Sequence, residues 1–330
     1  MQFRTEVKIQ KAPFSIQHHH KVLSIGSCFA EEIGQQLHQA KFTVETNPFG
    51  NLFHPYAIEN AVGRIHSRIH YIANEIFEYN HLFFSWDHHS SFSNPSKVDC
   101  LTHINQTIDK FNVFARNADF FIITLATSWV YKIKSNGIIV ANCHKFPQRE
   151  FQKLILTTQE IYESLLRTVK LILDIAPNAK IIFTVSPVRH IKDGIVENNV
   201  SKSRLINAVY QLVLQYNELH YFPSYEIMID DLRDYRFYKE DMIHPNQLAV
   251  DYIWQKFQET WMDEKTIQLN QQIHKVNLAM NHRPFNPNTL QHQSFLYNTC
   301  KEMKRLNSFL KSNNFDNEIE ILEQKIRNVN

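Results

Sequence analysis

Residues 21–34 constrain the fold of this chain more than any other stretch. They open with a short apolar run at 22–25, which is typical of a buried strand. Gly26 and Ser27 interrupt the run, and apolar residues then recur at helical spacing. The segment therefore predicts a strand, a tight turn and a helix, with Ser27 on the turn.

The position of Ser27 suggests chemistry. A hydroxyl on such a turn lies at the carboxyl edge of a sheet, beside unpaired backbone N–H groups at the start of a helix. This arrangement offers a nucleophile together with an oxyanion site. Alternatively, Ser27 only caps the helix, because serine is a favoured N-cap residue.

A second motif lies near the far end of the core, at Asp241 and His244. Their spacing of three residues predicts that they share one face of a helical turn. The carboxylate can then hold one ring nitrogen of the imidazole and leave the other free as a base. Together with Ser27, the chain order is Ser, Asp, His, as in a hydrolase triad.

Other apolar runs predict four further strands of a parallel sheet, and amphipathic patterns predict helices between them. The strands are expected at 42–45, 120–125, 180–186 and 221–228, and the helices at 56–72, 101–115, 157–176, 201–219 and 247–261. Ser201 is expected to be the N-cap of the fourth of these helices. We expect a three-layer α/β/α sandwich with a five-stranded parallel sheet in flavodoxin-like order, and a site at its carboxyl edge.

Several polar residues follow these strands and are expected at the same edge. Gly50 ends a turn that lies beside Ser27 in such a fold, where its N–H is a second oxyanion donor, although an ordinary loop fits equally well. Thr127, Tyr131, His144 and His190 are the other candidates for oxyanion or substrate binding. Cys143 beside His144 is a rival nucleophile, but neighbours in a strand seldom point at each other.

An aromatic, histidine-bearing stretch at 76–92 is predicted to be part of an insertion at about 74–99 that covers the site. Asp87, His88 and His89 within it are either metal ligands or members of a hydrogen-bonded loop. A third ligand at suitable spacing is missing, so we predict no metal site and no cofactor.

Seven segments carry a family resemblance. They are Ile25-Gly26-Ser27-Cys28-Phe29-Ala30 and residues 47–50, 85–90, 124–131, 142–145, 186–190 and 241–246. In this order they resemble the GSCFA family, which is similar to the SGNH (GDSL-like) hydrolases. The resemblance covers roughly residues 1–265, and the order of the segments makes it specific.

The resemblance implies an SGNH-like hydrolase or acyltransferase that acts on an acyl ester of a small molecule or carbohydrate. Ser27 is then the nucleophile, His244 the base and Asp241 its partner. SGNH enzymes supply an Asn side chain to the oxyanion hole where this chain has Thr127, and the family usually has Gly where it has Ala126. Alternatives are a non-catalytic carbohydrate- or ligand-binding module, with Trp86, Trp129 and Tyr131 as stacking surfaces, and metal-dependent hydrolysis through some of the 18 histidines.

Composition narrows the class of protein further. The 35 basic and 33 acidic residues nearly balance, so nothing calls for a nucleic acid partner. The four cysteines form no disulfide pattern, the N-terminus resembles no signal peptide, and no apolar run is long enough to span a membrane. We therefore expect a cytoplasmic protein.

Residues 265–330 differ in character from the rest, being polar and helix-forming. We expect a core domain at 1–264 and a helical C-terminal appendage at 265–330. The appendage is predicted either to pack on the core or to mediate formation of a homo-oligomer.

Overall fold

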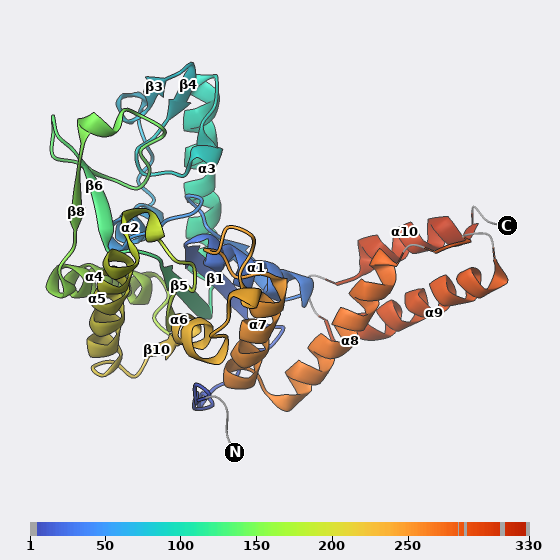
Figure 1. Ribbon diagram of the computed structural model, residues 1–330. Helices are drawn as coiled ribbons and strands as arrows, with labels where there is room; N and C mark the ends of the chain where they lie inside the picture. The colour runs from blue at the N-terminus through green and yellow to red at the C-terminus, as the bar shows by residue number, and fades with distance from the viewer. Residues whose placement is uncertain (1–4, 283, 287–288, 311–313, 328–330) are drawn as a thin grey trace. The chain divides into compact units, whose positions relative to one another are not determined.

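The computed structural model describes residues 5–282, 284–286, 289–310 and 314–327, which form two compact units (Figure 1). The first unit contains the described residues up to Ile9 together with 22–34 and 45–255. The second contains 10–21, 35–44 and the described residues from 256 onward.

A five-stranded parallel sheet lies mostly in the first unit. Its strands are β1 (Lys21–Gly26), β2 (Thr43–Thr46), β5 (Phe120–Leu125), β9 (Lys180–Val185) and β10 (Leu219–Phe222). They lie in the order β10-β9-β5-β1-β2, which is the predicted flavodoxin-like order. Val22 pairs with Phe120 and Phe121 with Ile181, so the most apolar strands are central. The predicted fold class is confirmed.

Successive side chains of each strand point to opposite faces of the sheet, and most are apolar on both faces. Helices therefore cover both faces. Leu23 and Ile25 share one buried core with α2 (Pro55–Ser67), α3 (Lys97–Ala115), α4 (Thr158–Ile175) and α5 (Ile195–Val213). Ser24 points the other way, and its hydroxyl donates to the Ala30 carbonyl of α1 (Cys28–Gln39) at 3.1 Å. Figure 1 shows α1 and α7 (Gln247–Trp261) on the side of β5 opposite α4 and α5.

Two smaller sheets are added to this framework. The hairpin β3 (Phe77–Tyr79) and β4 (Leu82–Phe84) lies in the predicted insertion. A three-stranded antiparallel sheet has the order β7-β6-β8, with β6 (Trp129–Ile133), β7 (Ile139–Val140) and β8 (Phe151–Ile155). Short 3-10 turns complete the first unit, at Ala73–Glu75, Ser90–Phe92, Gln148–Glu150, Ile191–Asp193 and Tyr235–Phe237.

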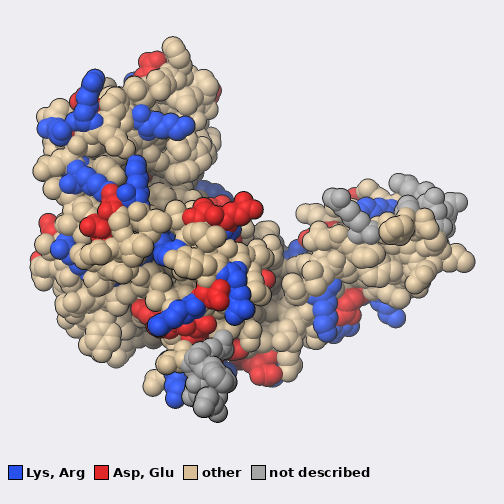
Figure 2. All heavy atoms as spheres, viewed as in Figure 1, with Lys and Arg blue, Asp and Glu red and all other residues tan. Residues whose placement is uncertain are grey.

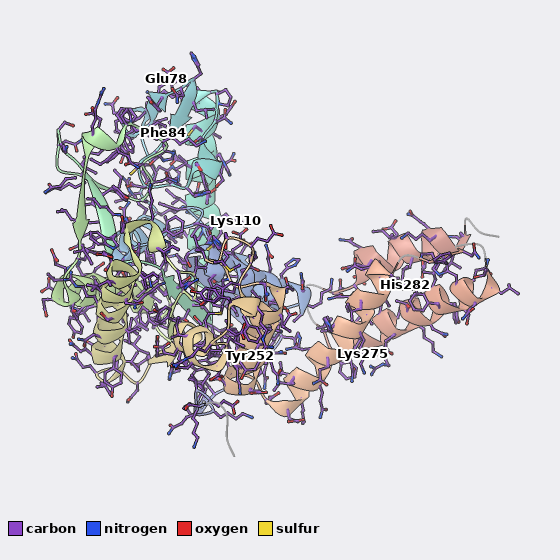
Figure 3. The ribbon with its side chains drawn as sticks, viewed as in Figure 1. Glu78, Phe84, Lys110, Tyr252, Lys275 and His282 are labelled. Atoms are coloured by element: carbon purple, nitrogen blue, oxygen red, sulfur yellow. The ribbon has the colours of Figure 1, made fainter. Side chains whose placement is uncertain are left out.

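Aromatic side chains join the two smaller sheets. The Trp86 ring lies 4.8 Å from that of Phe84, 5.7 Å from Phe146 and 5.9 Å from Phe151 (ring centroids). Figure 3 labels Phe84 and Glu78 on the hairpin. Trp86 is half-buried, and these ring contacts join the hairpin region to the three-stranded sheet.

Three local predictions were wrong. The fifth strand ends at Phe222 because Pro223 cannot continue it, and α6 (Ser224–Glu226) and a π-helix at Ile227–Asp231 follow. Helix α5 begins at Ile195, so Ser201 lies inside the helix and does not cap it. Asp241 and His244 lie on a turn, where Met242 has a φ of 57°, and not on a helix.

The second unit has its own apolar core. Helices α8 (Glu264–Asn281), α9 (Leu290–Asn307) and α10 (Asp316–Arg327) bury one cluster that includes Ile273, Met303 and Leu322. Asp263 caps α8 by accepting from Thr266 N–H at 2.8 Å. No helix among the described residues is both long enough and apolar enough to cross a bilayer.

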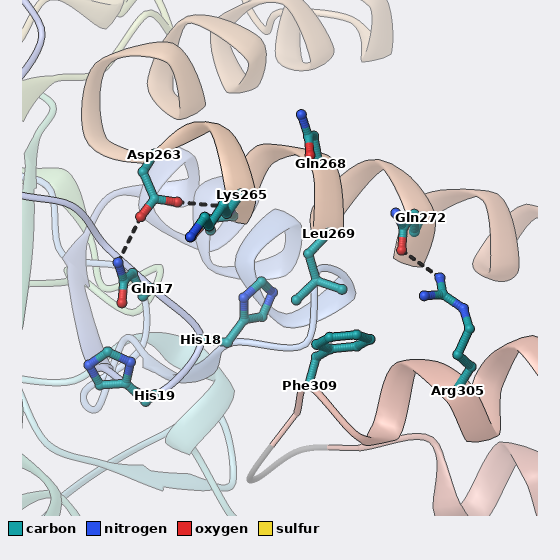
Figure 4. A pocket seen from close by; sticks show the side chains of 11 residues that line it. Gln17, His18, His19, Asp263, Lys265, Gln268, Leu269, Gln272, Arg305 and Phe309 are labelled. Carbon is teal, nitrogen blue, oxygen red and sulfur yellow. Dashed lines mark hydrogen bonds between the residues drawn. The ribbon is translucent and has the colours of Figure 1, made fainter.

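A cavity of about 450 Å³ also lies within the second unit (Figure 4). Gln17 Nε2 donates to Asp263 at 2.7 Å, and Arg305 donates to Gln272 at 2.7 Å. Its Asp263 and Arg305 side chains are thus already paired within the protein. Its other lining residues are His18, His19, Lys265, Thr266, Gln268, Leu269 and Phe309.

The junction of β1 and β5 generates a prediction. Gly26 has a φ of 146°, and a Cβ there would lie 2.1 Å from the Thr124 carbonyl oxygen. We expect Gly26→Ala to lower the free energy of unfolding in urea by about 3 kcal/mol or more. Gly137, with a φ of 77° and nothing within 4 Å of its Cβ position, is the control, and Gly137→Ala should cost about 1 kcal/mol. Equal losses in the two variants would show that the contact at Gly26 is unimportant.

Candidate active site

Ser27 lies on the turn between β1 and α1, as predicted. Its Oγ accepts a hydrogen bond from Phe29 N–H at 3.3 Å, so the hydroxyl caps the helix. Its own N–H donates to the Thr124 carbonyl at 3.2 Å and is not available to an oxyanion. Ser27 is 1% exposed, which means that a substrate reaches it only if the neighbouring loops move.

The turn at 47–50 lies beside Ser27. Gly26 N–H donates to Asn47 Oδ1 at 2.9 Å, and Asn47 N–H donates to the Ser24 carbonyl at 2.8 Å. The predicted oxyanion role of the Gly50 N–H is wrong for this structure, because that group donates to the Asn47 carbonyl at 2.8 Å. The side chain of Asn47 thus fixes the turn that the sequence placed here.

Asp241 and His244 form a hydrogen-bonded pair. His244 Nδ1 lies 2.6 Å from Asp241 Oδ2, and the backbone N–H groups of His244 and Ile243 donate to Oδ1 at 3.0 and 2.8 Å. These backbone bonds, followed by the imidazole contact, lower the pKa of Asp241 to about 2. A carboxylate on Nδ1 leaves His244 Nε2 free, and that atom has no partner among the described residues.

The loop that carries His244 is tied to the carboxyl edge of the sheet. Arg189, which follows β9, donates its N–H to the Ile243 carbonyl at 3.3 Å and its guanidinium to the Met242 carbonyl. Lys239 in the same loop lies 3.9 Å from Glu32 in α1. The loop therefore lies near the beginning of α1, which Ser27 caps. Within the described part of the chain, however, no hydrogen bond joins Ser27 to His244, and both side chains of the Asp–His pair are more than 40% exposed.

A cavity of about 430 Å³ lies between the three-stranded sheet β7-β6-β8 and the loop after β9. Three predicted substrate-binding residues line it, namely Thr127, Tyr131 and His190. The remaining lining residues are Phe53, His54, Trp129, Val140, Ala141, Asn142, Cys143, Lys145, Phe146, Gln148, Phe151, Lys153, Lys192 and Asp193. Ser27 and His244 are not among them, so this cavity is adjacent to the candidate triad and does not contain it.

The Thr127 hydroxyl is already used within the protein. Its Oγ1 accepts from Trp129 N–H at 3.1 Å and shares a hydrogen bond with Ser201 Oγ at 3.1 Å. Thr127 N–H donates to the Phe53 carbonyl at 3.0 Å. The predicted replacement of an oxyanion-hole Asn by Thr127 therefore finds no free donor here.

His144 and Cys143 have structural surroundings. The His144 ring stacks on Phe84 with centroids 4.2 Å apart, and its Nε2–H donates to the Ser85 carbonyl at 2.9 Å. Burial, partly opposed by that bond, lowers the pKa of His144 to about 4, and burial raises the pKa of the Cys143 thiol to about 11. A thiol that stays protonated is a poor nucleophile, which argues against the Cys143 alternative.

His190 connects the cavity with the Asp–His pair. Its N–H donates to Asn198 Oδ1 at 2.9 Å, and its ring meets Phe53 edge-on at 6.0 Å. Burial, followed by the charges of Lys202 and His244, lowers the pKa of His190 to about 3. His190 is therefore a neutral side chain that lines the cavity within electrostatic range of His244.

Lys202 is a residue whose position the sequence did not reveal. It is 1% exposed, and its Nζ donates to the Ser186 carbonyl at the end of β9 at 2.7 Å. Burial lowers its pKa to about 7, opposed by Cys28 and Glu226. Lys202 thus ties α5 to the end of β9. The only sequence signal was a lysine on the apolar face of a helix.

Comparison with known proteins places the chain among its relatives. The model of the GSCFA family matches residues 21–257. The chain belongs to the GSCFA family. A second model, described as GSCFA domain protein, C-terminal domain, matches residues 273–328.

No curated protein matches this GSCFA protein. Among solved structures, it is similar to a carbohydrate esterase family 3 from Talaromyces cellulolyticus, with 12% sequence identity and a TM-score of 0.36. That similarity covers 76% of this chain and 98% of the other.

His88 of this GSCFA protein is buried in an aromatic stack. Its ring lies 4.1 Å from Phe49 and 4.9 Å from Phe92, and neither ring nitrogen has a hydrogen-bond partner. Asp87 accepts instead from the Tyr71 hydroxyl at 2.8 Å. Among the described residues, no three His, Cys, Asp or Glu side chains are grouped so that they could hold a metal ion. The segment at 87–89 is therefore a packed loop.

The burial of His88 predicts sensitivity to acid. Burial lowers its pKa to about 3, so the unfolded chain binds a proton between pH 6.5 and 3 that the folded chain does not, and stability falls as the pH falls through this range. From pH 7 to pH 5, the free energy of unfolding should fall in both proteins. We expect the fall to be about 2 kcal/mol smaller in His88→Phe than in the unmodified protein. Urea unfolding at both pH values measures this, with the exposed His274→Gln as control. Parallel pH curves for His88→Phe and the unmodified protein would contradict it.

Proposed function

We propose that this protein is a serine-dependent ester hydrolase or acyltransferase, with Ser27 as nucleophile, His244 as base and Asp241 as its partner. The observation that carries the proposal is the 2.6 Å contact between Asp241 Oδ2 and His244 Nδ1, on a loop held at the sheet edge near Ser27. An imidazole oriented by a carboxylate, with its second nitrogen unpaired, is the arrangement that activates a serine hydroxyl.

The reaction proceeds in two halves. Ser27 Oγ bonds to the carbonyl carbon of the ester while its proton passes to His244 Nε2. The ester C–O bond then breaks, and His244 returns the proton to the leaving alcohol. Water, or a second alcohol, next attacks the acyl-Ser27 ester and repeats the transfer in reverse. Asp241 fixes the tautomer of His244 and stabilises the imidazolium without being protonated.

A backbone donor suited to an oxyanion is the Cys28 N–H. It follows Ser27 directly, opens helix α1, and donates to no backbone carbonyl within the described residues. The first N–H groups of a helix favour negative charge, and the residue after a nucleophile is a common oxyanion donor. The Cys28 thiol itself is not proposed as a nucleophile, because burial and then Glu32 raise its pKa.

The proposal requires a movement. Ser27 is almost fully buried and bonded to Phe29, whereas the side chains of Asp241 and His244 are exposed. Binding of an ester must therefore bring the loop at 238–245 toward the start of α1, and catalytic contacts often tighten only in the complex. The bonds from Arg189 to this loop limit its path.

Replacement of the nucleophile tests the proposal. We expect Ser27→Ala to reduce hydrolysis of p-nitrophenyl acetate by at least about 10³-fold, because no acyl-enzyme forms. Loss of the cap should cost about 1 kcal/mol, so thermal unfolding is measured in parallel. Ser27→Gly, which caps nearly as well, separates the two effects and should be equally inactive. Unchanged hydrolysis by both variants would exclude Ser27 as the nucleophile.

The Asp241 carboxylate provides a second test. We expect Asp241→Asn to lower kcat by about 10³-fold with a smaller change in KM, because His244 loses its fixed tautomer. Since the hydrogen bonds lower the pKa of Asp241 to about 2, the unmodified enzyme should show no ionisation of this carboxylate in its rate profile above pH 3. Asp234→Asn, on an exposed turn of the same region, is the control and should keep full activity. If Asp241→Asn changed kcat only slightly, Asp241 would not position His244 for catalysis.

Hydrolysis and acyl transfer differ only in the acceptor. Product analysis with and without a large excess of an alcohol distinguishes them, because a transferase yields a new ester. A different outcome is a ligand-binding module: it would leave Ser27 unlabelled by a serine-reactive phosphonate while carbohydrate binding persists. The cavity lined by Trp129 and Tyr131 favours this second candidate.

A further inference from the structure

We propose that the cavity between β6, β8 and the loop after β9 binds a negatively charged sugar, a sugar acid or a sugar phosphate. The proposal deepens the proposed function, since such a sugar would carry the ester or accept the acyl group. It depends on three observations: the aromatic walls, the balance of charge, and two buried nitrogens without partners.

The walls suit a sugar ring. Trp129 and Tyr131 project from β6, Phe151 comes from β8, and Phe53 and Phe146 complete the aromatic lining. Five aromatic rings around a cavity of about 430 Å³ offer flat apolar surfaces to the C–H faces of a pyranose. The volume is large enough for one or two such rings.

The charge of the lining is positive. Lys145, Lys153 and Lys192 line the cavity with a single acid, Asp193. Lys153 forms an ion pair with Asp193, and its Nζ lies 4.8 Å from the Trp129 ring centroid. Lys145 and Lys192 have no ion-pair partner in the described part of the chain, so two positive charges are left for a ligand. Figure 2 shows Lys and Arg side chains on the surface over β6 and β8.

Two buried nitrogens in the lining lack partners. They are Trp129 Nε1, which is only ever a donor, and His190 Nε2. A buried donor without a partner costs about 1–3 kcal/mol, so an oxygen-rich ligand is favoured over an apolar one. An acyl chain would satisfy neither nitrogen and would leave two lysines unpaired. An anionic sugar supplies anionic oxygens to the two lysines and hydroxyl groups to the polar side chains of the lining.

The cavity is connected to the chemistry through His190. This side chain lines the cavity, and the preceding residue, Arg189, donates to the Ile243 and Met242 carbonyls in the loop that carries His244. A sugar held there can present an acyl oxygen toward the loop at 238–245. The other wall is anchored by the Lys153–Asp193 ion pair, which joins β8 to the turn that follows His190.

Calorimetric titration of the full-length Ser27→Ala protein tests the proposal without turnover. The probes are glucuronate, glucose 6-phosphate, glucose and inorganic phosphate. We expect the two anionic sugars to bind at least tenfold more tightly than glucose and than phosphate. We expect the double variant Lys145→Gln/Lys192→Gln to weaken binding of the anionic sugars by about tenfold and to leave glucose binding unchanged. Trp129→Phe should weaken binding of all three sugars by a similar, smaller factor.

The control is Lys134→Gln, an exposed lysine after β6 that does not line the cavity, and its affinities should equal those of the parent. Anionic sugars that bind no better than glucose, or a double variant that matches Lys134→Gln, would overturn the proposal. If inorganic phosphate bound as tightly as glucose 6-phosphate, the proposal that the ligand is a sugar would be overturned. Hydrolysis of p-nitrophenyl acetate by the unmodified protein reports the proposed function separately, so either idea can fail alone.

Discussion

The contact between the end of β1 and the backbone of Thr124 on β5 determines how the candidate site is built. No Cβ fits between Gly26 and the Thr124 carbonyl, so the two strands approach closely at their carboxyl ends. The chain must then turn, Ser27 N–H donates to Thr124, and Asn47 takes up the Gly26 N–H. Through these bonds, the position of the Ser27 hydroxyl is set by the sheet and not by a flexible loop.

The parts of the fold that could be predicted are those where the pattern of apolar residues in a segment matches the burial of that segment in the structure. The run at 120–125 is apolar throughout because β5 is buried on both faces, and the same holds for β1 and β9. The Asp241–His244 contact followed from spacing alone, although a turn and not a helix supplies it. The prediction of a strand at 221–228 was wrong. The observed strand β10 has four residues and ends before Pro223, and the apolar residues that follow continue into a π-helix.

The donors expected to form an oxyanion hole show what a sequence does not reveal. Whether the N–H groups of Ser27 and Gly50 are free depends on strand register and turn closure, which involve residues far away or geometry without a side-chain signature. The cavity was hidden for a related reason. Its walls come from β6 and β8, short antiparallel strands that include polar residues and lack the apolar runs of the central sheet. Thr127, Tyr131 and His190 were nevertheless correctly expected to lie near one another.

Two regions with different chemistry thus share one edge of the sheet. One holds an oriented imidazole on an exposed turn near the start of α1, and the other is a cavity with aromatic walls and unpaired cations. His190 lies between them as a neutral, buried side chain. Lys202, sealed beneath the same region, keeps the end of β9 and helix α5 together.

Among the described residues, the antiparallel sheet β7-β6-β8 pairs with no other strand. Aromatic packing and two backbone hydrogen bonds to the Trp86 carbonyl join it to the segment that follows the hairpin β3-β4. A wall supported in this way is free to change its contour during evolution while the parallel sheet keeps its register. Homologues with an identical Ser, Asp and His arrangement are then expected to differ in the substrate that they accept. The aromatic rings and lysines of this three-stranded sheet would set that difference.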